Sequence, residues 1–308
     1  MLKYIVYTGV AALIVWAAAY LIYRFHQSLK GKRGCGCGGC PSCPHPLPPP
    51  QDIEADAHIG PQQGGALMDH QLKQLQDWIS ESRHIVFFGG AGVSTESGIP
   101  DFRSVDGLYR QQYAFPPETI LSHSFFERNP EEFYRFYRSK MLFPQARPNA
   151  AHWKLAELEA AGKLTAVVTQ NIDGLHQAAG SKTVYELHGS VHRNHCMKCR
   201  RFYGLDFLLE TGGVPRCPAC GGVVKPDVVL YEECLDETTM EGAVEAIAGA
   251  DMLIIGGTSL AVYPAAGLIR YYRGNRLALI NKSATPYDRE AGLVINASLG
   301  EVLGAIRV

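Results

Sequence analysis

The sequence GAGVSTESGIPDFRS, residues Gly90 to Ser104, is the stretch that decides the fold of this chain. It closely follows the apolar run His84-Ile-Val-Phe-Phe88, whose composition is typical of a buried parallel strand. In α/β proteins, a strand that leads into a glycine-rich turn and then a helix holds the pyrophosphate of a dinucleotide. The glycines let the backbone approach the phosphates, and the helix N-terminus favours their charge. The segment therefore predicts a dinucleotide site.

The spacing of this turn departs from the usual G-x-G-x-x-G pattern. Gly90 and Gly92 fit it, but Thr95 stands where the third glycine belongs. The tail of the segment adds an acid, an aromatic ring and a guanidinium on a chain stiffened by a proline, namely Asp101, Phe102, Arg103 and Pro100. Spacing alone makes this a weak dinucleotide signal, and the tail makes it specific.

Further strands and helices alternate along the chain. Apolar spacing predicts helices over 69–82, 130–141 and 150–161, and strands over 164–169, 252–256 and 276–280. This alternation predicts an α/β fold with a doubly wound parallel sheet, in which ligands bind past the carboxyl ends of the strands. Three polar strings follow predicted strand ends, namely Gln170–Asp173, Gly257–Ser259 and Asn281. We therefore expect one composite site.

Two Cys-x-x-Cys pairs predict a metal site. They are Cys196 with Cys199 and Cys217 with Cys220, and 17 residues separate the pairs. This is zinc-ribbon spacing, in which four thiolates complete a closed tetrahedral shell. A closed shell leaves no position for water, so we expect a structural zinc ion.

These motifs together resemble the sirtuins, the NAD-dependent protein deacylases. The resemblance rests on Gly90–Ser104, Thr169–His176, His188-Gly-Ser190, the two cysteine pairs, Gly257–Leu260 and Asn281, in family order over about residues 69–308. It implies a Rossmann-like catalytic domain over 66–308, with a small zinc-ribbon domain inserted at about 190–226. It also implies that NAD is a co-substrate cleaved at its nicotinamide bond, and that an acyl-lysine protein or peptide is the substrate.

The resemblance assigns roles to individual residues. His188 matches the general base, and Asn171 and Asp173 match the residues that hold the nicotinamide-ribose region. Asp101 matches the group that receives the nicotinamide carboxamide. The full set of implied NAD contacts is Gly90, Ala91, Gly92, Thr95, Asp101, Phe102, Arg103, Gln170, Asn171, Ile172, Asp173, His188, Gly257, Thr258, Ser259 and Asn281. Without the resemblance, Asp101 could equally be an Asx cap at a loop, and Asn281 would be an ordinary turn asparagine.

The segment Lys225–Tyr231 resembles the place where sirtuins add the substrate peptide as an extended strand. Val228 and Val229 would contact the lysine stem, although a simple edge strand is the alternative. Tyr137 matches a tyrosine that relatives removing acidic acyl groups carry near the acyl pocket. Lys140 stands where those relatives have arginine, and lysine lacks the bidentate fork for a carboxylate. We therefore expect a deacetylase, or an enzyme for neutral acyl groups.

Composition limits the function classes. The chain has 308 residues, 46% of them hydrophobic, and a formal net charge of -1. A near-neutral balance gives no electrostatic reason to expect direct nucleic-acid binding.

The chain begins with a candidate membrane anchor over residues 1–24. Tyr4 to Tyr23 is a run of 20 residues without a charge. At about 1.5 Å per residue, a helix of this length crosses a hydrocarbon core of about 30 Å. The cations that follow it, from Arg24 to Arg33, predict a single-pass protein of the cell membrane with its catalytic domain in the cytoplasm. A cleaved signal peptide, with Ala17–Ala19 as the cleavage site, is the alternative. If the anchor is processed, the protein is cytoplasmic.

Residues 25–65 read as a linker rich in cysteine and proline. Its cysteines, Cys35, Cys37, Cys40 and Cys43, could bind zinc, copper(I) or an iron–sulfur centre, or be incidental to a glycine-rich tether. With the apolar run, this stretch is similar to small cysteine-rich membrane proteins associated with bacterial ferrous-iron transporters.

Two rival functions remain open. Some sirtuin relatives are NAD-dependent protein ADP-ribosyltransferases, and such an enzyme would add ADP-ribose to protein. The N-terminal cysteines also allow a membrane-anchored metal or redox protein with an NAD-sensing domain.

Overall fold

The computed structural model describes residues 61–102, 107–108 and 113–308. Ile59–Val308 forms one compact unit. The predicted anchor, the four linker cysteines and Arg103 lie outside the described residues. Within the described ranges, no helix is both long and apolar enough to cross a membrane.

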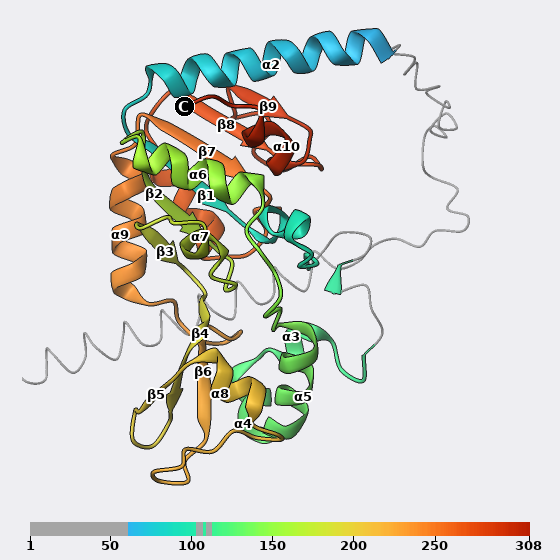
Figure 1. Ribbon diagram of the computed structural model, residues 1–308, viewed down its shortest axis with the longest axis vertical. Coiled ribbons are helices and arrows are strands. Elements are labelled where there is room, and N and C mark those ends of the chain that lie inside the picture. Colours follow the sequence, from blue (N-terminus) through green and yellow to red (C-terminus); the bar gives the residue numbers. More distant parts are fainter. Residues whose placement is uncertain (1–60, 103–106, 109–112) are drawn as a thin grey trace, which may run out of the picture. The chain divides into compact units, whose positions relative to one another are not determined.

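The main sheet is parallel throughout, and its strand order is β3-β2-β1-β7-β8-β9 (Figure 1). The strands are β1 (Ile85–Gly89), β2 (Leu164–Thr169), β3 (Val184–Glu186), β7 (Met252–Gly256), β8 (Arg276–Ile280) and β9 (Leu293–Ile295). The chain moves outward from β1 to β2 and β3 on one side, and returns to β7 on the other. The carboxyl ends of β1 and β7 therefore form the topological switch point, where such sheets bind ligands.

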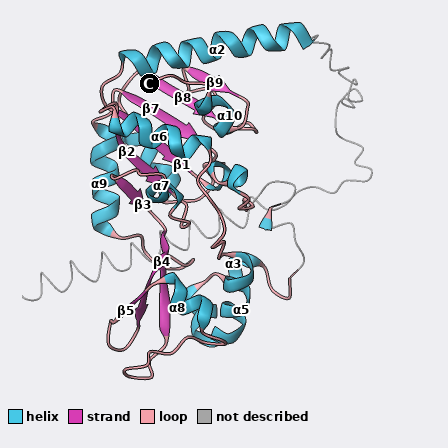
Figure 2. Cartoon of the chain, in the orientation of Figure 1, coloured by secondary structure: helices cyan, strands magenta, loops and turns pink. Residues whose placement is uncertain are grey.

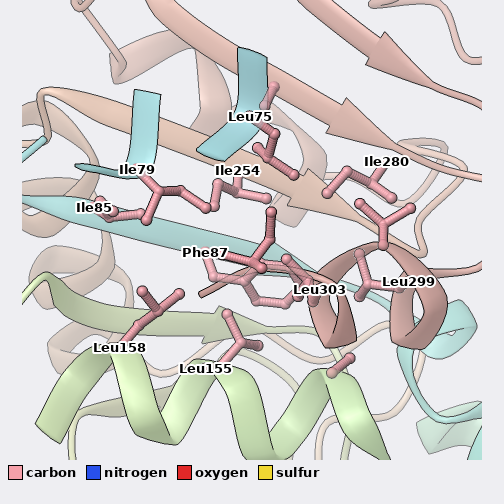
Figure 3. Packing of buried hydrophobic residues seen from close by; sticks show 14 of the residues in the cluster. Leu75, Ile79, Ile85, Phe87, Leu155, Leu158, Ile254, Ile280, Leu299 and Leu303 are labelled. Atoms are coloured by element: carbon pink, nitrogen blue, oxygen red, sulfur yellow. The ribbon is translucent and has the colours of Figure 1, made fainter. Parts of the chain in front are cut away.

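Helices cover both faces of this sheet, as a doubly wound fold requires. On one face lie α2 (Pro61–Glu81), α6 (Ala150–Ala160) and α10 (Leu299–Gly304), and on the other lie α9 (Glu237–Ala248) and the 3-10 helix η4 (Ala265–Tyr271). Ile85 and Phe87 of β1 point to the first face, and Val86 and Phe88 to the second. Figure 3 shows side chains of α2, α6 and α10 gathered around Phe87. Burying each such side chain contributes about 1.5–3 kcal/mol.

A smaller lobe is built from an antiparallel sheet and short helices (Figure 2). The sheet order is β5-β4-β6, from β4 (Gly189–Cys196), β5 (Phe202–Tyr203) and β6 (Val224–Val228). The helices are α3 (Pro117–Ile120), α4 (His123–Arg128), α5 (Pro130–Lys140) and α8 (Leu205–Glu210). The aromatic side chains of α4 and α5 pack with Val191 of β4 and Val228 of β6 in one core cluster.

Short elements connect the two lobes to the site. The 3-10 helices η1 (Ala91–Val93) and η2 (Thr95–Ser97) follow β1, and α7 (Leu175–Ala178) follows β2. The predicted α/β class, the parallel sheet and the strand positions are confirmed, and β2, β7 and β8 have the predicted bounds. The first helix, predicted from residue 69, begins at Pro61.

Candidate active site

A cavity of about 1440 Å³ opens at the switch point between β1 and β7. Its walls come from the loops after β1, β2, β7 and β8, and from β4, β6 and α8 of the smaller lobe. Every polar string that follows a predicted strand end lines this one cavity. The composite site expected from the sequence is thus present as a single space.

The loops after β1 and β7 touch backbone to backbone at the floor of the site. The Gly92 N–H donates to Gly257 O at 2.8 Å. A Cβ on Gly92 would lie 2.7 Å from Gly257 Cα, and a Cβ on Gly257 would lie 2.4 Å from Val93 N. Gly257 also has φ +59, which side chains rarely adopt. Thr95, which stands in place of a third glycine, uses its side chain within the loop, where its hydroxyl donates to Gly92 O at 3.0 Å.

A hydrogen-bonded network joins the loop after β1 to the loop after β2. Ser94 Oγ donates to Asp173 Oδ2 at 2.7 Å and accepts from Asn171 Nδ2 at 3.0 Å. The other carboxylate oxygen of Asp173 accepts from Leu175 N. Burial raises the pKa of Asp173 above its ordinary value, and the hydrogen bonds from Ser94 and Leu175 oppose that rise. The network fixes these polar side chains on the wall of the cavity.

His188 lies in the turn immediately before β4 and lines the same cavity. Its Nδ1 is 2.9 Å from the carbonyl oxygen of Gln170. Because a carbonyl oxygen can only accept, the proton of the neutral ring lies on Nδ1, and Nε2 is left with a lone pair. Burial lowers the pKa of His188, against a smaller rise from the bond to Gln170. The imidazole is therefore neutral at physiological pH and can accept a proton at Nε2.

Side chains after β7 and β8 complete the far wall. Gln170 Nε2 donates to Thr258 Oγ1 at 3.1 Å, and that hydroxyl oxygen also accepts from Leu260 N at 3.2 Å. Asn281 Nδ2 donates to Ser283 O at 2.8 Å. All of these residues except Leu260 line the cavity, as do Ala91, Gly90, Ser259 and Ile172.

Asp101 and Phe102 lie where the loop after β1 enters the smaller lobe. Both line the cavity, and the backbone carbonyl of Asp101 accepts from Leu108 N at 2.9 Å. The Phe102 ring also packs against the aromatic cluster of the smaller lobe, so its packing and cavity positions coincide.

The predicted substrate segment also reaches the cavity. Val228 pairs with Gly189 in the β4–β6 ladder, and the Val229 N–H donates to His188 O at 3.0 Å. Both valines line the cavity. Tyr137 does not: it is fully buried in the aromatic cluster, stacked on Phe133 with ring centroids 5.5 Å apart.

Tyr137, the residue expected near the acyl pocket, thus lies outside the cavity. The helix end beyond Tyr137 supplies cavity residues instead, namely Lys140, Met141, Phe143 and Pro144.

The four paired cysteines fit a tetrahedral zinc ion. Their sulfur atoms all lie within 4.8 Å of one another, with Cys196 and Cys220 3.5 Å apart and Cys199 and Cys217 3.6 Å apart. Zn–S bonds of about 2.3 Å place the sulfurs of a tetrahedron about 3.8 Å apart. The four are not disulfide-bonded. The Tyr203 hydroxyl lies 2.9 Å from Cys217 Sγ and can support that ligand.

Two contributors were not expected from the sequence. Ser94 belongs to the opening motif, but its hydroxyl becomes informative only when Asp173 and Asn171 are placed beside it. Asn149 caps α6 and also donates from Nδ2 to Val93 O at 2.7 Å and to Ser97 Oγ at 3.0 Å. Asparagine is a common residue just before a helix, but the second role of Asn149 depends on a contact 56 residues away.

Comparison with protein families gives two matches. The model of the Sir2 family matches residues 90–264. A model described as FeoB-associated Cys-rich membrane protein matches residues 8–44.

Individual relatives cover most of the chain. It is 62% identical over 242 residues to the NAD-dependent protein deacetylase of Clostridium perfringens, a match that covers 78% of this chain and 99% of that protein. It is 43% identical over 241 residues to the NAD-dependent protein deacetylase of Staphylococcus aureus, over 78% of this chain and 99% of that protein.

Solved structures agree with these relatives. A Sir2 structure with a p53 peptide and NAD+ is 41% identical with a TM-score of 0.67, over 75% of this chain and 95% of that chain. A Sir2 structure bound to an acetylated peptide is 39% identical with a TM-score of 0.67, over the same shares.

Proposed function

The chain belongs to the Sir2 family, and we propose that it is an NAD-dependent protein-lysine deacetylase that releases nicotinamide and forms free lysine and O-acetyl-ADP-ribose. One observation carries the proposal: a single cavity is lined by the glycine loop after β1, by a neutral His188 and by Val228 and Val229. A dinucleotide loop, a base and a peptide-binding segment are the parts that this reaction needs.

NAD, when bound, supplies a ribose carbon that becomes electrophilic as nicotinamide leaves. Gly90, Ala91, Gly92 and Thr95 would hold the pyrophosphate, and Gly257, Thr258, Ser259 and Asn281 the adenosine side. Asp101 would accept the nicotinamide carboxamide, Phe102 would exclude water from the ribose, and Arg103 would support the loop. The position of these loop residues on the cavity wall, at the switch point between β1 and β7, supports this placement.

His188 would act as the general base on a ribose hydroxyl. Its Nδ1–H is held by Gln170 O, so the ring is fixed in the tautomer that accepts a proton at Nε2. Its lowered pKa keeps the ring neutral at the pH of the cell, which is the form that can accept a proton. Asn171 and Asp173, held by Ser94, would orient the ribose that presents this hydroxyl, and Ile172 would pack beside it.

The acyl-lysine would lie in the cavity beside Val228 and Val229. We propose acetyl or another neutral acyl group. Met141, Phe143 and Pro144 give the cavity an apolar portion that suits such a group, and Lys140 offers no bidentate fork for a carboxylate. A role for Tyr137 would have to be indirect, through the packing of α5, because the ring does not reach the cavity.

The zinc ion would be structural. Four thiolates close its shell, so it has no open position for substrate or water. It would hold β4, β5 and β6 together. β4 begins next to His188, and β6 ends at Val228.

Replacing His188 tests the mechanism. His188→Ala should keep ADP-ribose binding and zinc content but reduce deacetylation by at least about 100-fold, since general bases contribute 10²–10⁴-fold. His84→Ala is a matched control, because His84 is exposed just before β1, at the opposite end of the strand. Turnover of His188→Ala at the wild-type rate would refute the assignment.

A second assay separates deacetylation from ADP-ribosyl transfer. NAD-dependent nicotinamide release should be stimulated most by acetyl-lysine peptide, less by long-acyl peptide and least by succinyl peptide. Mass spectrometry of the peptide should show loss of the acetyl group. A gain of ADP-ribose on protein, with the acetyl group retained, would favour the ADP-ribosyltransferase instead.

We also propose that residues 1–24 anchor the catalytic domain, residues 66–308, to the cytoplasmic face of the cell membrane through the linker 25–65. The uncharged run Tyr4–Tyr23 and the similarity of residues 8–44 to a cysteine-rich membrane protein support this. The linker thiols Cys35, Cys37, Cys40 and Cys43 would then be available to a metal ion near the membrane.

Membrane fractionation of the full chain tests the anchor. Wild type should remain in the pellet after an alkaline wash, and Leu13→Lys should move it to the soluble fraction. Intact-mass measurement distinguishes an anchor from a signal peptide, because a mature chain that begins near residue 20 would contradict the anchor.

A further inference from the structure

Glu96 makes a long-range contact that the proposed mechanism does not use. It lies in η2, within the opening motif, and its Oε2 accepts from the backbone N–H of Gly300 at 2.7 Å. Its Oε1 accepts from Ser298 Oγ at 3.3 Å. The two residues begin α10, more than two hundred positions later in the chain.

Residues next to both ends of this link line the cavity. Thr95, beside Glu96, lines it from the glycine-loop side, and Ser298 and Leu299 line it from α10. Ser298 is the N-cap of α10 but its side chain makes no capping hydrogen bond, so the carboxylate of Glu96 takes an N–H at the start of the helix in its place. A carboxylate at a helix N-terminus is also stabilised by the helix dipole.

The loop after β1 is thereby bonded to two helices, at Val93 and Ser97 to α6 and at Glu96 to α10. Asn149 binds it from the α6 side, through Val93 O and Ser97 Oγ. Glu96 binds it from the α10 side. Loss of Glu96 would leave Asn149 holding one side, while the wall at Ser298 and the phosphate loop at Thr95 could separate.

We propose that Glu96 is a positioning residue for NAD, which sets the distance between the loop that holds the pyrophosphate and the start of α10, and so tunes the affinity for the ADP-ribose half of the co-substrate. The inference rests on the proposed function. It predicts an effect on NAD that spares the acyl-peptide and the chemical step, because Glu96 contacts neither His188 nor β6.

The lack of a side chain at Gly300 leaves room for the Glu96 carboxylate. The three atoms closest to a Cβ built on Gly300 all belong to the Glu96 carboxyl group, with both oxygens at 2.7 Å. A methyl group there would displace the carboxylate from the N–H. In a helix the same substitution is otherwise favourable, since alanine is a better helix former than glycine.

The test uses the full chain with Glu96→Ala, Glu96→Gln and Gly300→Ala, and Glu245→Ala on the exposed side of α9 as the control. Glu96→Ala should raise KM for NAD and the Kd of ADP-ribose about fivefold, the size of one lost cap of about 1 kcal/mol. The kcat and the KM for acetyl-peptide should stay near wild type. Glu96→Gln should recover most of the affinity, because the amide oxygen can accept from Gly300 N.

The double variant gives the sharpest result. Gly300→Ala alone should match Glu96→Ala, whereas adding it to Glu96→Ala should cost nothing further, because both break the same contact. Unchanged ADP-ribose affinity in Glu96→Ala would overturn the inference, as would equal losses in kcat, peptide KM and NAD KM. A wild-type chain that binds no ADP-ribose would overturn the proposed function as well.

Discussion

Asp173 shows, at the scale of one residue, a conflict between stability and function. Burial raises its pKa, so the folded state favours the protonated form more than the unfolded chain does. For an acid with a raised pKa, the stabilising contribution is present at low pH and is lost as pH rises through the folded pKa. Above its raised pKa, the ionised side chain is thus a cost to the fold, retained beside the proposed ribose site.

Asp173→Asn should therefore be at least as stable as wild type at neutral pH. Its advantage should shrink as pH falls from the raised pKa of the folded state to the ordinary pKa of aspartate, because the wild-type carboxyl becomes neutral over that interval. Deacetylation should fall by at least about tenfold, or about 1.4 kcal/mol in the barrier. Urea midpoints at neutral and acidic pH, with kcat/KM for NAD, measure both effects. A less stable variant at neutral pH would contradict this balance.

Individual residues were predictable from the sequence only when their motif carried their role. His188, Asn171, Asp173 and the glycines all lie in recognisable strings, and the structure brings them to one cavity. Ser94, Asn149 and Glu96 act through partners 79, 56 and 204 residues away. No local pattern encodes a contact at that separation, so these three positions required the fold.

Among the elements, the backbones of the loops after β1 and β7 approach so closely that neither Gly92 nor Gly257 has room for a Cβ atom. This close approach is the physical reason for Gly92 and Gly257, whereas Thr95 has a side chain that bonds to the loop through Gly92 O. The glycines of this motif therefore act first on the packing of two loops.

Gly92→Ala should destabilise the fold by about 1–3 kcal/mol, the usual cost of overpacking. Its Cβ would lie 2.7 Å from the Gly257 backbone, which cannot swing away as a side chain could. ADP-ribose affinity should fall with it. Gly212→Ala is the control, because a Cβ there meets nothing within 4 Å. Equal urea midpoints for the two variants would refute the argument.

The helices α6 and α7 bury a pair of histidines against each other. The rings of His152 and His176 are 4.8 Å apart, and neither nitrogen of His176 has a hydrogen-bond partner within the described part of the chain. Burial lowers the pKa of His152 to about 4. Burial, with a smaller contribution from His152, lowers that of His176 to about 3.

This pair predicts acid instability. Below the ordinary histidine pKa of about 6.5 the unfolded chain binds protons that the folded chain does not, so each histidine removes up to about 1.4 kcal/mol of stability per pH unit. The loss begins near that value and continues down to the folded pKa values. His176→Leu should lose less stability than wild type between about pH 8 and about pH 5 in urea titrations. Parallel pH profiles for His176→Leu and wild type would contradict the role of the pair.

Elements with a strong apolar period were predicted best. The strands β2, β7 and β8 are buried runs with clear boundaries, and α6 ends within one residue of its predicted end. The 3-10 helix η4 was not predicted, since Ala265–Ile269 is buried throughout and shows no polar face.

At the scale of the whole molecule, zinc should matter to peptide binding more than to NAD binding. The four paired cysteines lie at one end of the antiparallel sheet β5-β4-β6. At the other end of the β4–β6 ladder, next to the cavity, Gly189 pairs with Val228. The main parallel sheet has its own core clusters, in which no ribbon residue takes part.

Removing zinc with a chelator should therefore reduce deacetylation by at least about tenfold while ADP-ribose affinity changes little. Adding zinc back should restore turnover. Calorimetry of ADP-ribose binding, beside the deacetylation rate, separates the two effects. Full activity of zinc-free protein would show that the ribbon is not needed to hold the substrate segment.

The sequence alone predicted the α/β class, the parallel sheet, the cysteine set and the polar strings that line the cavity. It could do so because periodic burial and short motifs are local properties of the chain. The tertiary structure decided which of these residues meet. The strand order brings β1 beside β7, the return of α10 puts Gly300 under Glu96, and the aromatic cluster encloses Tyr137 away from the cavity. Such neighbours follow from how layers pack across the whole chain, a relation that sequence spacing does not carry.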